Sequence, residues 1–389
     1  MANRLTTSIY LPMYRNLSPR MAGQLAQQYE ATGVVDQMIT ADQLTSWFPR
    51  ALWRPDVTAM AEMVPDCDSF PDAFQTAAFA AAATERLGVA VSTDAIRRGP
   101  AELMQTMLTL ASATEGDATL CLGAGEVKHA KPFGYRRSEG LARLEDHLRL
   151  YRMLWECDGP FDFDGNVWHY RKAWLGSARP YRPKVWAMGG GPKLIELAAA
   201  HADGLLTLAP GAFPTPEDFA RMVTSVKQLL ERQGRDPEAF DFGVWSVVLL
   251  HDDPGVIDAA FDNPLVKWLA IAGRLHQGDW RRAGLEPIAA DDWHYALHLL
   301  PAEMSQADID AFLGNVTKAH AEKSYISGTS KEVSQRLSEY VDAGATWVGF
   351  IDFAPCVLPL DEMLTAIGRS FDVCSQLKAA HPLRASGKP

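Results

Sequence analysis

The chain has 389 residues, of which 47% are hydrophobic and 22% are charged, a composition that excludes disordered, collagenous and coiled-coil proteins. It carries 37 Lys and Arg against 48 Asp and Glu, a formal net charge of −11, which disfavours binding to nucleic acid or to anionic membranes. The longest apolar stretch, near residues 77–83, is far shorter than the roughly 20 residues of a membrane-spanning helix, so we expect no membrane span.

The start of the chain lacks the apolar core of a secretory signal. Its five cysteines are scattered and never occur with Cys-x-x-Cys spacing. This usage predicts reduced thiols in the cytoplasm and no metal site.

Strand-like and helix-like segments alternate along the chain. Alternating or buried apolar runs predict strands at 5–11, 34–40, 87–92, 118–122, 184–188, 204–208, 242–250 and 346–351. Amphipathic spacing predicts helices at 20–32, 73–86, 101–113, 138–155, 192–201, 217–232 and 360–377. About eight strand-then-helix units predict an α/β protein with a (β/α)8 TIM barrel.

We expect a single barrel domain over residues 1–380 and a flexible tail over 381–389. Two segments exceed a minimal barrel, about 50–70 and 252–320. Both follow the carboxyl end of a predicted strand, which is the face where barrel enzymes build active sites. Each is either a packing decoration or part of a substrate site.

Polar residues follow the second and third predicted strands. Asp42, with Trp47 five residues later, could bind a polar ring edge and stack on its face, or could be a capping residue and a core indole. Arg97 and Arg98 precede a proline that opens a helix, so they either meet an anion at that helix start or form a solvated basic pair.

Glycines follow the fourth and fifth predicted strands. Glu126 ends a Gly-x-Gly-Glu sequence and is expected to point into the barrel mouth, with His129 and Lys131 just beyond it. Gly189, Gly190 and Gly191 precede a proline and a helix, an arrangement whose backbone amides can hold a phosphate.

Together these segments resemble the bacterial luciferase-like barrel family, in its branch that depends on the deazaflavin coenzyme F-420. The resemblance covers most of the chain and rests on five motifs in order. They are Asp-x-x-x-x-Trp at 42–47, Thr-Asp-x-x-Arg-Arg-x-Pro at 93–100, Gly-x-Gly-Glu at 123–126, Gly-Gly-Gly-Pro with Ala-Asp-Gly at 189–204, and Ser-Gly-Thr-x-x-Glu-Val at 327–333. Lys-Pro-Phe-Gly at 131–134 and Gly-Arg-Asp-Pro at 234–237 look similar to mycobacterial phthiodiolone dimycocerosate ketoreductases.

The resemblance implies where the coenzyme lies. A non-prolyl cis peptide between Ala90 and Val91 would back its ring, and the triple glycine would hold its phosphate. The remaining implied contacts are Asp42, Thr93, Glu126 and His129 for the ring and its hydroxylated chain, and Arg97, Arg98 and Lys131 for the anionic tail.

The resemblance also implies the reaction, hydride transfer between F-420 and a ketone, an enone or an alcohol. Trp47 and Glu126 would face the reacting carbon. Many dehydrogenases of the family have a histidine where this chain has Gln43, and glutamine transfers no proton near pH 7. Glu126 is therefore the expected proton donor, with His129 as the second choice.

Aromatic residues near the expected mouth predict a bulky apolar substrate. They are Phe48, Trp53, Trp245, Trp268 and Trp293; each could instead belong to the core, and the prediction requires that several of them face the mouth. Two other functions stay open: an FMN-dependent monooxygenase of the same fold, and a flavin-binding relative without catalysis. The resemblance further implies a homodimer.

Overall fold

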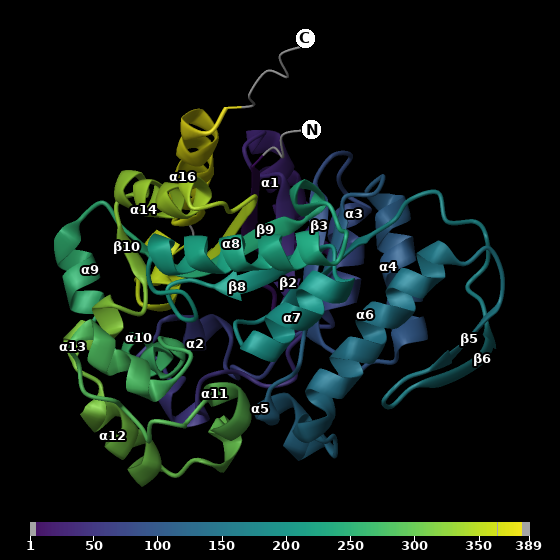
Figure 1. Cartoon of the computed structure of the whole chain (residues 1–389). Helices are drawn as coiled ribbons and strands as arrows, with labels where there is room; N and C mark the ends of the chain where they lie inside the picture. The colour runs from purple at the N-terminus through teal and green to yellow at the C-terminus, as the bar shows by residue number, and fades with distance from the viewer. Residues whose placement is uncertain (1–4, 364, 383–389) are drawn as a thin grey trace.

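The computed structural model describes residues 5–363 and 365–382 and contains a closed barrel of eight parallel strands (Figure 1). In the order of their pairing the strands are β1 (Thr6–Tyr10), β2 (Gln37–Ala41), β3 (Gly88–Asp94), β4 (Ala118–Gly123), β7 (Lys184–Met188), β8 (Gly204–Leu208), β9 (Asp241–Leu250) and β11 (Trp347–Asp352). Pairing of β8 with β9 and of β11 with β1 closes the ring. The predicted TIM barrel is confirmed.

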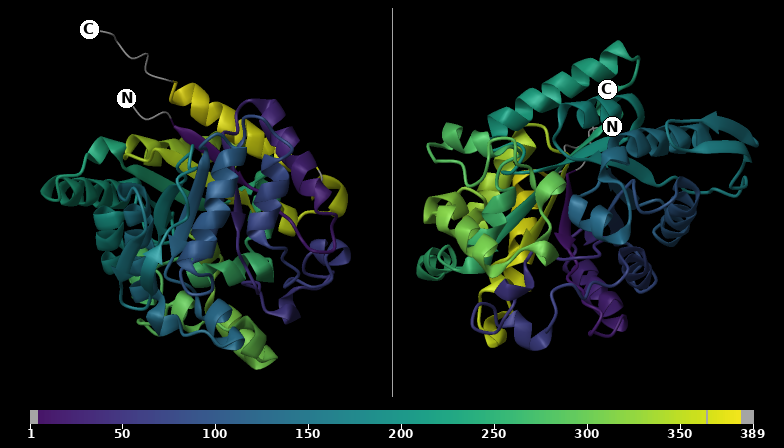
Figure 2. Two further views of the ribbon diagram at one scale, coloured as in Figure 1. Left: turned by 90° about the vertical axis from the view of Figure 1, so that its right-hand side faces the viewer. Right: turned by 90° about the horizontal axis from the view of Figure 1, so that it is seen from below.

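Helices surround the barrel. They are α1 (Arg20–Thr32), α3 (Ala73–Ala81), α4 (Pro100–Ala113), α6 (Gly140–Glu156), α7 (Pro192–His201), α8 (Pro216–Arg232), α14 (Ser330–Asp342) and α16 (Ile367–Ala380). Figure 2 shows α16 beside α1, where the rings of Phe371 and Tyr29 lie 5.6 Å apart. The first and last helices of the barrel therefore pack against each other.

Two helices differ from the prediction. The helix predicted at 73–86 ends at Ala81, because the backbone N–H groups of residues 85–87 donate to the carboxylate of Glu30 on α1 instead of continuing the helix. The helix predicted at 360–377 is divided into α15 (Leu360–Met363) and α16. The sequence reading also missed α14, which begins with a capping box between Thr329 and Glu332.

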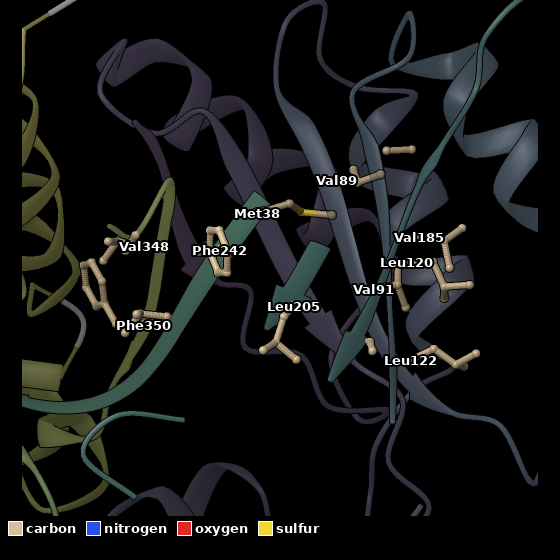
Figure 3. Close-up of a cluster of buried hydrophobic side chains, with 14 of the residues drawn as sticks. Met38, Val89, Val91, Leu120, Leu122, Val185, Leu205, Phe242, Val348 and Phe350 are labelled. Carbon is tan, nitrogen blue, oxygen red and sulfur yellow. The ribbon is translucent and has the colours of Figure 1, made fainter. Parts of the chain in front are cut away.

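Strand residues alternate between the barrel interior and the helix layer. Ala90 of β3 and Cys121 of β4 belong to the interior cluster with Trp186 and Trp347. Their neighbours along the strands pack against the helices, and Figure 3 shows part of that layer, including Val89 and Leu120. The period of two along each strand thus yields two cores, and the interior is filled by side chains.

Three further strands lie outside the barrel. The hairpin of β5 (Phe161–Asp164) and β6 (His169–Ala173) lies beside α6, and β10 (Ile326–Gly328) pairs with the end of β9. The carboxylate of Asp146 on α6 accepts N–H groups from Asn166, Val167 and Trp168 in the hairpin turn. This tertiary contact fixes a hairpin that the sequence reading did not predict.

The two segments beyond the minimal barrel pack together at the carboxyl ends of the strands (Figure 1). The first contains η1 (Arg50–Leu52) and α2 (Met60–Met63). The second contains α9 (Pro254–Ala260), α10 (Pro264–Leu269), η5 (Ala270–Ala272), η6 (Gln277–Ala283), α11 (Tyr295–His298), η7 (Pro301–Glu303), α12 (Gln306–Asn315) and α13 (Lys318–Glu322). Their shared apolar cluster includes Trp53 of the first segment and Trp268 of the second.

Within residues 5–363 and 365–382, no helix has the length and apolar character needed to cross a lipid bilayer. The tail predicted at 381–389 lies, beyond residue 382, outside the described residues.

Candidate active site

Asp42 lies directly after β2 and is the centre of a buried charge cluster at the barrel rim. Its side chain is 4% exposed and accepts a hydrogen bond from Thr93 Oγ1 at 2.7 Å. Arg98 Nε donates to the same Asp42 oxygen at 3.0 Å, and Arg97 Nη2 lies 3.3 Å from it. The loops after β2 and β3 are therefore joined through one carboxylate.

Both arginines have further carboxylate partners within the chain. Arg97 Nε donates to Asp94, and its side chain is only 6% exposed. Arg98 Nη2 donates to Asp72 at 2.7 Å, at the cap of α3. This corrects the prediction that the pair meets an external anion: Arg97 is enclosed by Asp42 and Asp94, and Arg98 links Asp42 to Asp72.

A second charge cluster follows β4. Lys128 lies on the short helix α5 (Val127–Ala130), and its side chain is only 2% exposed. Its Nζ lies 3.2 Å from Glu126 Oε2 and 2.6 Å from His129 Nε2, and it donates to the carbonyl of Thr45 at 3.1 Å. Glu126 is 26% exposed and therefore opens toward the mouth, whereas Lys128 lies behind it.

Burial changes the protonation behaviour of this cluster. Desolvation lowers the pKa of the Lys128 ammonium; the Glu126 carboxylate opposes this shift and Arg97 adds to it. Desolvation, together with Lys128 and Arg97, places the pKa of His129 well below its usual value. His129 is therefore neutral near pH 7.

The second added segment (residues 252–320) packs over the charge cluster around Lys128. Helix α11 lies against α5 (Figure 1), and the ring of Tyr295 lies 4.7 Å from that of Trp47. Burial raises the pKa of the Tyr295 phenol, with a further contribution from the Glu126 carboxylate and opposition from Arg137. The mouth thus combines the Trp47 indole and the Tyr295 phenol with the partly exposed carboxylate of Glu126 and the buried amine of Lys128.

The aromatic residues predicted to line a substrate pocket divide into two groups. Trp268 is fully buried, packs on Phe312 at 5.2 Å, and donates its indole N–H to the carbonyl of Trp47 at 2.7 Å. It belongs to the core under the mouth, which corrects the prediction that it lines the pocket. Trp53 is 7% exposed but borders a cavity of about 230 Å³ that Arg50 and Asp66 also line.

The other three predicted aromatic residues, Phe48, Trp245 and Trp293, are half-buried. Phe48 stacks on Phe353 at 5.7 Å, and Trp293 lies 6.0 Å from Phe312. Trp245 meets the ring of Tyr10 at 6.2 Å at the upper end of the barrel interior. Phe48 and Trp293 pack on the apolar cluster that the two added segments share, and Trp245 packs on the barrel interior.

The triple glycine follows β7 and ends at the N-terminus of α7. Gly191 is the N-cap residue, and no side chain of the described chain caps the helix. A Cβ at Gly191 would meet no heavy atom within 4 Å, whereas one at Gly190 would lie 3.7 Å from the hydroxyl of Thr207. That hydroxyl is buried and has no hydrogen-bond partner, so an unused hydroxyl lies near the glycine that precedes the N-cap of α7.

The predicted cis peptide between Ala90 and Val91 is wrong. Among residues 5–363 and 365–382, the one cis bond joins Ala209 and Pro210. Ala90 and Val91 keep regular parallel register with Thr119 and Leu120, which a trans backbone provides without the roughly 3–4 kcal/mol of a non-prolyl cis bond. Ala90 faces the interior, and Val91 packs against the helices.

The remaining predicted residues also lie at this rim. Gln43 Oε1 is buried without a hydrogen-bond partner. Lys131 is exposed and its Nζ donates to Glu303 Oε2 at 3.0 Å, so it connects α5 to the second segment.

Sequence reasoning missed Lys128, Tyr295 and Thr207. Lys128 lies between the two predicted residues Glu126 and His129, but lysine side chains are mostly exposed and nothing local marks this one as buried. Tyr295 and Thr207 carry no motif, and only the folded chain brings them to the rim.

Asp352 ends β11 and connects two strands at the same end of the barrel. Its Oδ1 accepts N–H groups from Leu250 at 3.2 Å and Ala354 at 3.0 Å, while Oδ2 is buried without a hydrogen-bond partner. Burial raises the pKa of this carboxyl to about 7, although both N–H groups and Arg369 oppose the shift.

The raised pKa predicts a pH dependence of stability. Asp352 is protonated in the folded chain up to about pH 7, whereas an unfolded aspartate ionises near pH 4. Its contribution to the free energy of unfolding is therefore present below about pH 4 and is lost as the pH rises to about 7. Denaturant titrations should show this decline in the wild type and a weaker one in Asp352→Asn. The exposed Asp292→Asn is the control, and equal pH profiles for wild type and Asp352→Asn would contradict the assignment.

Comparisons with known proteins agree with this architecture. The sequence model of the family described as luciferase-like monooxygenase matches residues 6–346. Phthiodiolone/phenolphthiodiolone dimycocerosates ketoreductase of Mycobacterium sp. (strain JLS) is 30% identical over 319 residues, which are 79% of this chain and 81% of the relative.

Solved structures have the same fold. An F420-dependent secondary alcohol dehydrogenase in complex with an F420–acetone adduct superimposes with a TM-score of 0.72 at 18% identity, over 96% of this chain and 99% of the other. Riboflavin lyase with modified FMN and riboflavin superimposes with a TM-score of 0.68 at 14% identity, over 99% of this chain and 94% of the other. At these identities the likeness concerns the fold alone.

Proposed function

The chain belongs to the luciferase-like monooxygenase family, and we propose that it is an oxidoreductase that uses coenzyme F-420. In this proposal, hydride passes between the deazaflavin and a ketone or the corresponding secondary alcohol. The 30% identical relative is named a ketoreductase, and a structural neighbour is an F420-dependent alcohol dehydrogenase. The name of the 30% identical relative favours this reaction over oxygenation, and the dehydrogenase shows that the fold can carry it.

The observation that carries the proposal is the pair of binding features on one rim. The N-terminus of α7, with Gly191 and the unused hydroxyl of Thr207, fits the phosphate of a coenzyme. The carboxylate of Glu126 lies at the end of β4, the strand that pairs with β7. A ligand held by its phosphate at α7 can therefore reach the charge cluster with its ring.

In this proposal, the residues at the rim have separate roles. When bound, the deazaflavin supplies a hydride at a carbon atom and does not activate oxygen productively. Glu126 holds or accepts the proton at the substrate oxygen, and Trp47 orients the reacting carbon against the coenzyme. Gln43, whose Oε1 has no hydrogen-bond partner, contributes an acceptor at the same rim but no proton.

We propose a bulky apolar substrate. The half-buried rings of Trp47, Phe48, Trp293 and Tyr295 gather over the mouth, on the apolar cluster that the two added segments share. Such a surface favours a large apolar ketone over a sugar phosphate, because an apolar wall gives phosphate no hydrogen bonds.

Titration with each coenzyme tests the proposal. We expect the protein to bind F-420 saturably, to retain no FMN, and to oxidise reduced F-420 when apolar ketones are added. Coenzyme fluorescence measures the binding, and absorbance measures the turnover. Retention of FMN without F-420 binding would instead favour the monooxygenase, and F-420 binding without turnover over a broad carbonyl panel would favour a non-catalytic binding protein.

Gly191→Val should weaken F-420 binding without destabilising the fold. The new side chain enters the open space at the N-terminus of α7, where its methyl groups obstruct a phosphate. Gly159→Val is the matched control, because a Cβ at Gly159 also meets no heavy atom within 4 Å. Fluorescence titration and thermal melting are the measurements. Unchanged affinity in Gly191→Val would place the phosphate elsewhere.

Glu126→Gln should lower kcat by about 100-fold or more while F-420 affinity changes little. The amide keeps the shape of the carboxyl but cannot exchange a proton at the substrate oxygen. Steady-state kinetics and fluorescence titration separate the two effects. Parallel losses of turnover and affinity would make Glu126 a coenzyme contact only.

A further inference from the structure

Lys128 is the most enclosed ionisable group of the rim, and the proposed function leaves it without a role. Its 2% exposed side chain carries an amine that contacts a carboxylate, an imidazole and a backbone carbonyl. Nζ also lies 5.2 Å from the centre of the Trp47 ring. A buried amine at such a place needs a partner for each hydrogen and lone pair it carries.

His129 determines what Lys128 can offer. The backbone N–H of Leu44 points at His129 Nδ1 at 3.3 Å, and a backbone N–H can only donate. A neutral imidazole has one donor and one acceptor nitrogen, so an accepting Nδ1 leaves the hydrogen on Nε2. Nε2–H then donates to Nζ across 2.6 Å, and Nζ must supply a lone pair.

The neighbours of Nζ match a neutral amine. Such an amine has two hydrogens and one lone pair. One hydrogen is donated to Thr45 O at 3.1 Å, and the second can turn toward Glu126 Oε2, which lies 3.2 Å away and has no other hydrogen-bond partner. His129 Nε2–H is the donor to the lone pair. An ammonium would have no lone pair to accept the N–H of His129.

The surrounding charges permit this state. Burial and Arg97 favour loss of the Lys128 proton, while Glu126 and Asp68 oppose it. Glu126 also interacts electrostatically with Arg137 and with the phenol of Tyr295, and the charge of Arg137 still opposes that of the carboxylate when Lys128 is neutral. The cluster is therefore not left with an unbalanced charge.

We propose that Lys128 rests as a neutral amine and exchanges the catalytic proton with the substrate through Glu126. This proposal rests on the proposed function for its substrate, a ketone or secondary alcohol. Lys128 acts through Glu126 and is a positioning and proton-storing residue. It performs the proton exchange that Gln43 cannot perform.

The step balances as follows for alcohol oxidation. The substrate O–H bond breaks, its proton goes to Glu126, and a carboxyl proton passes to the lone pair of Lys128, which becomes an ammonium. The C–H electron pair leaves as hydride to the deazaflavin, and the oxygen electron pair forms the C=O bond. To take the carboxyl proton, Nζ turns its lone pair from His129 to Glu126, and the ammonium directs its third hydrogen at the face of the Trp47 ring, whose centre lies 5.2 Å from Nζ. His129 keeps its hydrogen on Nε2 throughout. Ketone reduction reverses each transfer.

Two substitutions at Lys128 separate proton exchange from a structural role. Lys128→Met should lower kcat by about 100-fold or more, shift the pH profile of kcat, and change F-420 affinity by less than about threefold. Lys128→Arg should have a kcat as low as that of Lys128→Met, because a guanidinium stays charged and cannot serve as a neutral base. Lys227→Met, on the outer helix α8, is the control.

Recovery of kcat in Lys128→Arg, or a wild-type pH profile in Lys128→Met, would overturn the proposal.

A second measurement needs neither coenzyme nor substrate. In the wild-type protein labelled with nitrogen-15 in lysine, Nζ of Lys128 should have the chemical shift of a neutral amine at pH 7. Loss of the signal in Lys128→Met assigns it. An ammonium shift at pH 7 would overturn the proposal even if the variants are slow. Failure of the wild type to bind F-420 would instead overturn the proposed function alone, because this resonance is read without coenzyme.

Discussion

Neutralisation of buried charge at one rim of the barrel is the constraint on which the site depends. Three acidic and three basic side chains follow neighbouring strands there: Asp42, Asp94 and Glu126 with Arg97, Lys128 and Arg137. A buried charge without a partner destabilises a protein by several kcal/mol, so each of these side chains restricts the positions of the others. The loops after β2, β3 and β4 are thereby held in one arrangement before any ligand binds.

The two added segments give this cluster its surroundings. They share an apolar core above the barrel, and Tyr295 of the second segment lies on Trp47, which directly precedes the first. Their contact keeps water from Lys128 and His129 and makes the effective dielectric low, which strengthens every charge interaction beneath it. The second segment therefore encloses the charge cluster and is a candidate determinant of substrate choice.

The barrel geometry places the proposed phosphate-binding site next to the charge cluster. The strands are parallel, so the carboxyl ends of β2, β3, β4, β7 and β8 lie at one rim in the order of their pairing. The helix amides at Gly191 and the hydroxyl of Thr207 occupy one part of that rim, and the charge cluster occupies the adjacent part. An anionic group and a reactive ring of one ligand can be held at both places, which is the arrangement that a phosphorylated redox coenzyme needs.

The sequence by itself determined the architecture and the location of the site. The alternation of apolar residues along strands predicted the barrel, with the bounds of β7 and β8 as observed, because burial on both faces of a strand leaves a local signal. Asp42, Glu126 and the triple glycine stand at strand ends in the sequence, and they therefore lie at the rim in the fold.

Tertiary structure alone decided what these residues do to one another. Arg97 is enclosed by Asp42 and Asp94, and Lys128 is buried because Tyr295, from a distant part of the chain, lies over the loops around it. The charge state of an amine depends on the water and the donors around it, and these are set by contacts between segments far apart in sequence. Such contacts cannot be predicted from the pattern of residues that are neighbours in the sequence.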